Sequence, residues 1–418
     1  MTATQIAKTD KGTSLYFAAR WSLIGQVCFY GLQWLNMIAL ARLSGPEALG
    51  LYTLGLAIAN PVMALAGLKF RMVYITEIRN RWGFREFEKL SAFSIPIGVA
   101  AILLVAYLLG YREIALIAIM LAASWKTAEV LSELNYSIPH KHGAMQLIAG
   151  SMILRAAIST VVLITTLYLT DDLIISLCFF SASWWVCFLF VDRKLSQGAE
   201  PKAGDTPTNA LFWLALPMAA SASLVYLTNS VPRIVLDQFE STEVLGVFAA
   251  VSHLMLIGTM MLNSFASVIT PRLSRFYAEG DTKRFYSEAF LLIGVSAFAS
   301  LSFMIVSYFG GNLILYIIYG EAMEGYGSLI FMISLASFPM YIGCIMGFIP
   351  PALQAFRFHL SVNVLTVVVV TVTALALIPT LGLTGAVYAL AIQGIVQLLN
   401  GLILLRKPPK FVPEEPVS

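Results

Sequence analysis

The chain has 418 residues, of which 59% are hydrophobic and only 12% are charged, and its formal net charge is +3. With a mean hydropathy of +0.81 this composition excludes a water-soluble globular protein and places the chain among polytopic membrane proteins. The small positive charge gives no reason to expect a nucleic acid as a partner.

About twelve apolar stretches follow one another along the chain, each long enough to cross a hydrocarbon core of about 30 Å. Charged or Gly/Pro-rich segments separate them. The predicted helices lie at residues 16–40, 48–70, 91–110, 113–136, 144–169, 172–191, 209–231, 244–270, 287–309, 326–349, 358–379 and 383–405. The sequence therefore predicts an all-α polytopic membrane protein.

Lys and Arg are distributed unevenly between the loops on the two sides. The loops on the side of the two termini hold most of them, whereas the opposite loops hold only Arg42, Arg112 and Arg233 and are otherwise acidic. By the positive-inside rule we expect both termini in the cytoplasm. Residues 1–11 lack the apolar core and cleavage site of a signal peptide, so the first span is expected to direct insertion.

A short motif of the first half recurs in the second half. Residues 47–52 (EALGLY) are matched by residues 243–248 (EVLGVF), and each copy opens an apolar stretch. Many secondary transporters consist of two similar lobes, which can rock about a central site near the bilayer midplane. We therefore expect two six-helix lobes related by an internal parallel repeat, at residues 1–200 and 209–418, with residues 192–208 as a flexible cytoplasmic linker.

Polar side chains form a stripe on the first helix of each half. The stripe of the first helix contains Ser22, Gln26, Tyr30 and Gln33, with Arg20 near its cytoplasmic end and Asn36 slightly to one side, and that of the seventh contains Tyr226, Asn229 and Arg233. Such stripes suggest the wall of a central cavity, but hydrogen bonds between helices also place Gln and Asn inside a bundle. Arg233, next to Pro232, could instead anchor the helix at the lipid headgroups.

Ionisable residues inside a span cost about 2.5–3.5 kcal/mol each, so they normally face a bundle interior or a water-filled cavity. In the fourth span Lys126, Glu129 and Glu133 share one helical stripe, where Lys126 and Glu129 could neutralise each other and either carboxylate could couple transport to a cation. In the fifth span Arg155 has no acidic neighbour on its own helix. It therefore either lines a cavity or pairs with a residue of another helix.

Motifs for ATP hydrolysis, zinc peptidase chemistry and a nucleophilic serine are absent from the sequence. The four cysteines lie inside predicted helices without paired spacing, so we expect neither disulfides nor a metal site. The predicted external loops are short, and residues 312–320 are too short to span, so they are expected to form an interfacial half-helix. These features favour a transporter without a cofactor over an enzyme.

The run at residues 41–52 (ARLSGPEALGLY), followed by an apolar helix and a basic loop, resembles the polysaccharide-biosynthesis branch of the multidrug/oligosaccharidyl-lipid/polysaccharide (MOP) exporter superfamily. That branch contains the bacterial O-antigen and exopolysaccharide flippases. The resemblance extends through residues 233–248 and 315–321 and covers essentially the whole chain. It implies a twelve-helix MOP-type fold, V-shaped around a central cavity.

The function that the resemblance implies is translocation of undecaprenyl-diphosphate-linked oligosaccharide units across the bacterial inner membrane by alternating access. The partners would be this lipid-linked substrate, membrane lipids and other polysaccharide assembly proteins. A lipid diphosphate is anionic, so Arg20, Lys126 and Arg155 are its expected cationic contacts. The expected sugar contacts are the polar and aromatic residues Gln26, Gln33, Asn36, Tyr226 and Asn229.

Two other functions remain open from the sequence. A cation-coupled multidrug exporter of the same superfamily would need a membrane-embedded carboxylate, for which Glu129 and Glu133 are the candidates. A membrane-embedded polysaccharide polymerase or transferase is disfavoured by the short external loops.

Overall fold

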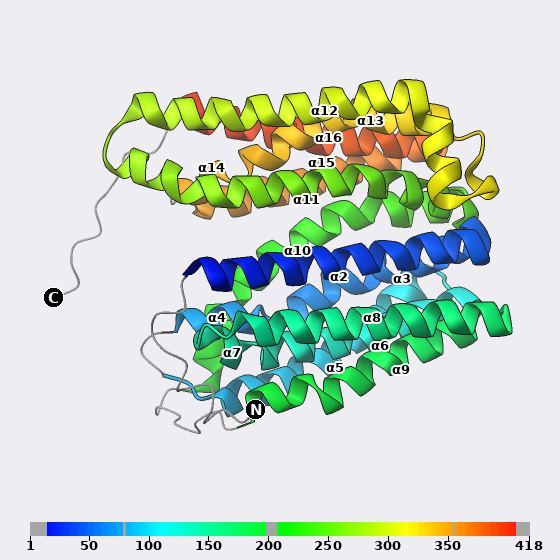
Figure 1. The fold of residues 1–418 in the computed structure, drawn as a ribbon, viewed down its shortest axis with the longest axis horizontal. Coiled ribbons are helices and arrows are strands. Elements are labelled where there is room, and N and C mark those ends of the chain that lie inside the picture. The colour runs from blue at the N-terminus through cyan, green and yellow to red at the C-terminus, as the bar shows by residue number, and fades with distance from the viewer. Residues whose placement is uncertain (1–14, 78–80, 198–206, 354–355, 407–418) are drawn as a thin grey trace. The chain divides into compact units, whose positions relative to one another are not determined.

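The computed structural model describes residues 15–77, 81–197, 207–353 and 356–406 (Figure 1). Within these residues, twelve helices are long and apolar enough to cross a membrane. They are Phe17–Leu43, Gly45–Thr76, Phe84–Leu108, Glu113–Lys141, Met145–Thr170, Leu173–Ser196, Thr208–Phe239, Thr242–Ala266, Thr282–Tyr319, Gly327–Met346, Leu360–Leu381 and Leu383–Arg406. The predicted all-helical membrane fold with twelve spans is therefore confirmed.

The chain divides into two compact units, residues 1–227 and residues 228–418. The first unit contains α2 (Leu15–Leu43), α3 (Gly45–Ala66), α4 (Phe70–Thr76), α5 (Phe84–Leu108), α6 (Glu113–Asn135), α7 (Ser137–Lys141), α8 (Met145–Thr170), α9 (Leu173–Phe190), η1 (Asp192–Ser196) and the first part of α10 (Thr208–Phe239). The second unit contains the rest of α10 and the helices α11 (Thr242–Ala278), α12 (Thr282–Tyr319), η2 (Glu321–Met323), α13 (Gly327–Met346), α14 (Ile349–Ala352), α15 (Phe356–Leu381) and α16 (Leu383–Arg406).

The two units divide within α10. Leu211, Ala215 and Ala219 of its first part belong to a buried apolar cluster with residues of α4, α5 and α6. In its second part, Asn229 accepts a hydrogen bond from Gln393 of α16. The sequence places the start of the second lobe at residue 209, whereas the contacts place the change of unit at residues 227 and 228.

Several helix starts follow from local sequence signals. Pro46 lies in the first turn of α3, where its missing N–H would have no intrahelical partner. Asp172, Ser241 and Asp281 precede α9, α11 and α12, and each side chain accepts a hydrogen bond from the backbone N–H three residues later. These caps satisfy donors that the first turn of a helix leaves free.

Small residues allow close helix packing in the first unit, where α2 packs on α8 and α3 on α6. A Cβ atom at Gly25 would lie 2.8 Å from the Cβ of Ala149, and one at Gly55 would lie 2.8 Å from the Cβ of Ala122. In the membrane, helix association depends on such van der Waals contact, because lipid tails are as apolar as leucine. Beside this contact, the Tyr52 ring of α3 stacks on Trp125 of α6 with ring centroids 5.6 Å apart.

The second predicted span is interrupted near one end. α3 ends at Ala66, Leu68 and Lys69 have φ angles of +47° and +48°, and α4 begins at Phe70. Bulky residues rarely adopt this left-handed conformation. A Cβ atom at Gly67 would lie 2.8 Å from Cγ1 of Val130, so the chain passes close to α6 at the break. The break sets the direction of Lys69 and of the short helix that follows it.

The prediction of a separate half-helix at residues 312–320 is wrong. These residues form the end of α12, which is continuous from Thr282 to Tyr319. A Cβ atom at Gly311 would lie 2.6 Å from Cγ2 of Ile330 in α13, and Asn312 Oδ1 accepts a hydrogen bond of 2.8 Å from the Gly327 N–H. Packing on α13 therefore keeps the chain helical through its two adjacent glycines.

In the second unit, α13 and α16 approach closely at Gly394, so a larger residue at this position should destabilise the protein. A Cβ atom there would overlap the backbone of Pro339 and Met340. We expect Gly394→Ala to lower the free energy of unfolding by about 1–3 kcal/mol, because the helices must move apart. Thermal unfolding of the purified protein measures the change. The control is Gly294→Ala in α12, where a Cβ atom would meet nothing within 4 Å. Equal melting temperatures for the two variants would contradict close packing at Gly394.

Candidate functional site

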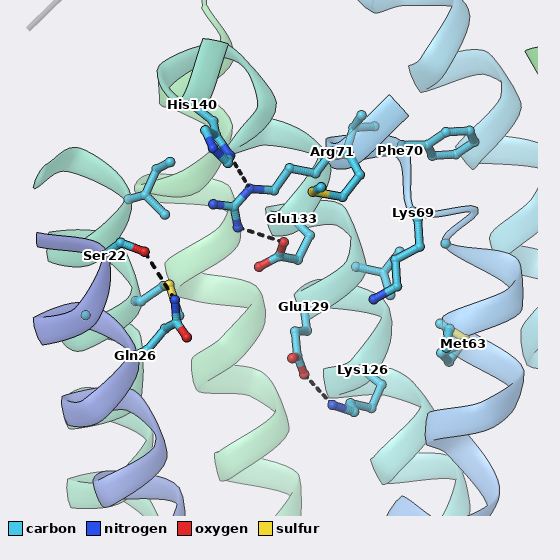
Figure 2. A pocket seen from close by; sticks show the side chains of 18 of the residues that line it. Ser22, Gln26, Met63, Lys69, Phe70, Arg71, Lys126, Glu129, Glu133 and His140 are labelled. Atoms are coloured by element: carbon cyan, nitrogen blue, oxygen red, sulfur yellow. Dashed lines mark hydrogen bonds and ion pairs between the residues drawn. The ribbon is translucent and has the colours of Figure 1, made fainter. Parts of the chain in front are cut away.

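The first unit contains a cavity of about 610 Å³, a volume typical of ligand pockets. Residues of α2, α3, α4, α6, α7 and α8 line it, together with Tyr226 of α10. Its polar and charged lining residues are Ser22, Gln26, Tyr30, Asn60, Lys69, Arg71, Lys126, Glu129, Glu133, His140 and Tyr226. Figure 2 shows charged side chains from α4 and α6 converging on this space. The cavity therefore has a polar wall made by several helices of one unit.

Lys126 and Glu129 form an ion pair in the cavity wall. The Lys126 Nζ lies 2.6 Å from Glu129 Oε2, one turn along α6, and the two side chains are 19% and 24% exposed. The sequence left open whether these residues neutralise each other or line a cavity. In the structure they do both, since a half-buried pair still presents its outer atoms to the cavity (Figure 2).

Arg71 links α4 to α6 and α7. Its Nη1 lies 2.9 Å from Glu133 Oε2, and its Nε donates a hydrogen bond of 3.1 Å to Nδ1 of His140. An imidazole nitrogen that accepts this bond carries no proton, so His140 is neutral in this arrangement. Arg71 therefore neutralises Glu133 and joins three helices at one end of the cavity.

The lining charges do not cancel. Lys69, Arg71 and Lys126 contribute three positive charges, and Glu129 and Glu133 contribute two negative ones, which leaves a net charge of +1 with His140 neutral. Ion pairs within 4.0 Å join Arg71 to Glu133 and Lys126 to Glu129. The cavity can therefore accept an anionic group.

Uncharged polar groups on α2 line another part of the cavity. Gln26 Nε2 donates a hydrogen bond of 3.1 Å to Oγ of Ser22, and both side chains lie across the cavity from Lys69 (Figure 2). Tyr30 of α2 and Tyr226 of α10 add two phenol groups. Hydroxyl and amide groups of this kind suit hydrogen bonds to hydroxyl-rich ligands.

The structure places five of the site residues predicted from the sequence in this cavity: Gln26, Tyr226, Lys126, Glu129 and Glu133. It places six elsewhere. Arg20 is exposed on α2, Asn229 and Arg233 lie in the second unit, and Gln33, Asn36 and Arg155 are held by other helix residues. Lys69, Arg71 and His140 also line the cavity and were missed. Lys69 and Arg71 lie at and after a break that hydropathy does not show, and His140 lies in the short helix α7 that follows α6.

Gln33 and Asn36 take part in helix packing. Asn36 is fully buried, and its Nδ2 lies 3.4 Å from Oε1 of Gln33. Tyr52 of α3 donates to the same oxygen at 3.3 Å. Of the two interpretations of the first-helix stripe, hydrogen bonding between helices therefore applies to Gln33, and cavity lining applies to Gln26. Asn36 is buried and bonds to Gln33 within α2.

The expectation that Arg155 lies in the cavity needs correction. Its side chain is 1% exposed, it does not line the cavity, and its Nη1 lies 3.1 Å from Oδ2 of Asp192. Asp192 is fully buried and also accepts hydrogen bonds from the hydroxyl groups of Ser132, Tyr136 and Ser151. The sequence assigned Asp192 to the linker, whereas the structure places it in η1 against α6 and α8. Arg155 therefore forms a structural inter-helix pair.

No group of three or more His, Cys, Asp or Glu side chains among the described residues is placed to hold a metal ion.

Comparison with known proteins gives the family and the fold. Residues 18–277 match a family model described as polysaccharide biosynthesis protein. The chain is 24% identical over 376 residues to the capsular polysaccharide biosynthesis protein CapF of Staphylococcus aureus, which covers 88% of this chain and 93% of that one.

Solved structures show the same architecture. An inward-facing multidrug resistance MATE family transporter of the MOP superfamily is similar with a TM-score of 0.71 and 15% identity, over 92% of this chain and 97% of that one. A MOP superfamily transporter from Pyrococcus furiosus is similar with a TM-score of 0.62 and 15% identity, over 97% of each chain. The predicted MOP-type fold is therefore confirmed.

Proposed function

We propose, since this chain belongs to the polysaccharide biosynthesis protein family, that it is a flippase for undecaprenyl-diphosphate-linked oligosaccharide units. It would act in the bacterial inner membrane with both termini in the cytoplasm, as part of the assembly of a surface polysaccharide such as capsule or O-antigen. The similarity to a capsular polysaccharide biosynthesis protein supports a polysaccharide-linked substrate.

The observation that carries this proposal is the net positive cavity of the first unit, built from Lys69, Arg71 and Lys126 against Glu129 and Glu133. A lipid diphosphate entering it would exchange water for cationic side chains in a region of low dielectric constant, where each charge–charge contact is stronger than in water. The neutral wall of Ser22, Gln26 and Tyr226 lies where sugar hydroxyl groups attached to that diphosphate could bind.

The membrane potential favours the proposed direction of transport. With a negative cell interior, each negative charge that moves outward gains about 2.3 kcal/mol per 100 mV. A substrate that carries its own negative charges therefore needs no ATP for outward movement. The charges of the cavity are consistent with binding of such a substrate.

The proposal predicts a specific defect in cells without the gene. We expect undecaprenyl-linked oligosaccharide to accumulate on the cytoplasmic face and surface polysaccharide to be lost, because synthesis of the unit continues while its transfer stops. Lipid extraction with mass spectrometry and surface glycan staining measure both effects, and the wild-type gene on a plasmid is the control. An unchanged surface glycan without accumulation would refute the flippase function.

A cation-coupled multidrug exporter is the second candidate, because Glu129 and Glu133 line the cavity and the MATE transporters share the fold. Both carboxylates are paired with a cation, which favours a structural role over a proton or sodium carrier. Increased drug sensitivity of the deletion strain with a normal surface glycan would favour the exporter. Purified protein that lengthened lipid-linked glycans by itself would instead indicate a polymerase or transferase.

A further inference from the structure

Lys69 occupies a distinct position in the cavity of the first unit. It follows Leu68 in the break between α3 and α4, and both residues have left-handed φ angles. Its side chain is exposed and points into the cavity, on the side opposite Ser22 and Gln26 (Figure 2). If α3 continued without a break, the helix would determine where the Lys69 side chain points. Here the left-handed backbone at Leu68 and Lys69 determines it instead.

The other cations of this region have carboxylate partners within 4.0 Å. Lys126 is held by Glu129, Arg71 by Glu133, and Arg155 by Asp192 outside the cavity. In the described part of the chain Lys69 forms no such ion pair, although it lies close enough to contribute to the electrostatic environment of Glu129. The excess positive charge of the cavity is therefore located on Lys69.

At this position Lys69 can bind an anion that enters the cavity. A lysine ammonium is a compact charge on a flexible stem with three donors, so it can follow an oxygen-rich group that approaches from one side. The carboxylates of Glu129 and Glu133 would repel an anion that approached Lys126 or Arg71 directly. Lys69 comes from the break before α4 and lies on the side of Glu129 that faces away from Ser22 and Gln26 (Figure 2).

We propose that Lys69 is the primary binding residue for a phosphate or diphosphate group in this cavity, while Lys126 and Arg71 remain paired and shape the wall. The inference rests on the proposed function and deepens it, because it assigns the headgroup contact to a residue outside the predicted set. The chemistry is shared by a free diphosphate and by a lipid diphosphate, so the experiment must separate the two.

The experiment measures anion binding to the purified full-length protein in lipid nanodiscs at low ionic strength. One arm titrates inorganic pyrophosphate, and the other compares nanodiscs with and without undecaprenyl diphosphate. The test variant is Lys69→Asn, because Asn removes the charge and tolerates a positive φ. Lys69→Arg keeps the charge, and Lys89→Gln removes an exposed lysine of α5 that does not line the cavity.

We expect Lys69→Asn to bind at least about tenfold more weakly, because a charge-assisted hydrogen bond is lost. Lys69→Arg should retain most of the affinity, and Lys89→Gln should match the wild type. A loss in both arms would identify a general diphosphate site, and a loss in the lipid arm alone would identify a site for lipid headgroups. Wild-type affinity of Lys69→Asn in both arms, or no binding by the wild type in either, would overturn the proposal.

The binding test of Lys69 and the gene-deletion test of the flippase function can fail independently of each other. If the deletion strain traps lipid-linked oligosaccharide but Lys69→Asn binds and exports normally, the function stands and the assignment of Lys69 fails. If Lys69→Asn loses pyrophosphate binding but the deletion strain has a normal glycan and no trapped lipid, the anion site stands and the flippase function fails. Size-exclusion profiles matching the wild type would show that Lys69→Asn is folded.

Discussion

Replacing Asp192 with alanine is expected to lower the free energy of unfolding by about 3–5 kcal/mol, the usual effect of breaking a buried ion pair. The variant would leave the Arg155 guanidinium, which is 1% exposed, without its carboxylate. It would also leave the hydroxyl groups of Ser132, Tyr136 and Ser151 without a shared acceptor. The melting temperature in detergent and the yield of monodisperse protein measure this loss.

Two further variants separate the buried pair from a general effect of removing an acid. Asp172→Ala removes an exposed cap of α9 and should cost only about 1 kcal/mol. Arg155→Met combined with Asp192→Asn removes the buried charges and keeps an acceptor for the hydroxyl groups, so it should be more stable than Asp192→Ala. A melting temperature of Asp192→Ala equal to that of Asp172→Ala would contradict the structural role of the network.

The twelve spans could be predicted because the bilayer imposes a strict requirement on each of them. Backbone N–H and C=O groups must be paired within the segment, and about 20 apolar residues must cover the hydrocarbon core. Hydropathy therefore shows α6 and α8, predicted at 113–136 and 144–169, almost as the structure has them, at Glu113–Asn135 and Met145–Thr170. The break at Leu68 and Lys69 could not be found in this way, because no proline or run of charges marks it and it depends on close contact with Val130.

The candidate site was predicted in part for a related reason. Helical spacing correctly grouped Lys126, Glu129 and Glu133, because neighbours on one helix face are set by the local chain. The role of Arg155 depends on Asp192, which is 37 residues away and follows a different helix. The Gly, Pro, Lys and Asp content of residues 192–208 led the whole segment, Asp192 included, to be assigned as linker. Pairing between residues of different helices depends on the tertiary structure, so the periodicity of one helix cannot predict it.

The same distinction applies to the polar stripe of α2. Gln26 and Gln33 lie seven residues apart on one face, yet Gln26 lines the cavity and Gln33 accepts a hydrogen bond from Tyr52. Spacing shows that both face the bundle interior, but the neighbouring helix decides whether that interior is packed or open. Near Tyr52 it is packed by the stacked Trp125 ring.

If the chain is the proposed flippase, reversing the charge of Lys126 is expected to abolish surface polysaccharide export. Lys126→Glu changes the net charge of the cavity from +1 to −1 and places a third carboxylate beside Glu129 and Glu133. Two unit charges about 4 Å apart interact by about 4 kcal/mol at an effective dielectric constant of about 20. Repulsion of this size would lower the affinity for an anion by more than about 100-fold. Surface glycan in a deletion strain that carries the variant gene, at wild-type protein levels, measures the loss.

The matched variants test whether the loss comes from the cavity charge. Lys126→Glu with Glu129→Lys restores one cation and one carboxylate a turn apart on α6 and returns the net charge to +1, so it should recover much of the export. Lys89→Glu makes the same reversal on the exposed side of α5 and should leave export unchanged. If Lys126→Glu exported at the wild-type rate, the positive charge of the cavity would have no part in substrate binding. Recovery by the exchanged pair would instead tie export to the net charge of the cavity.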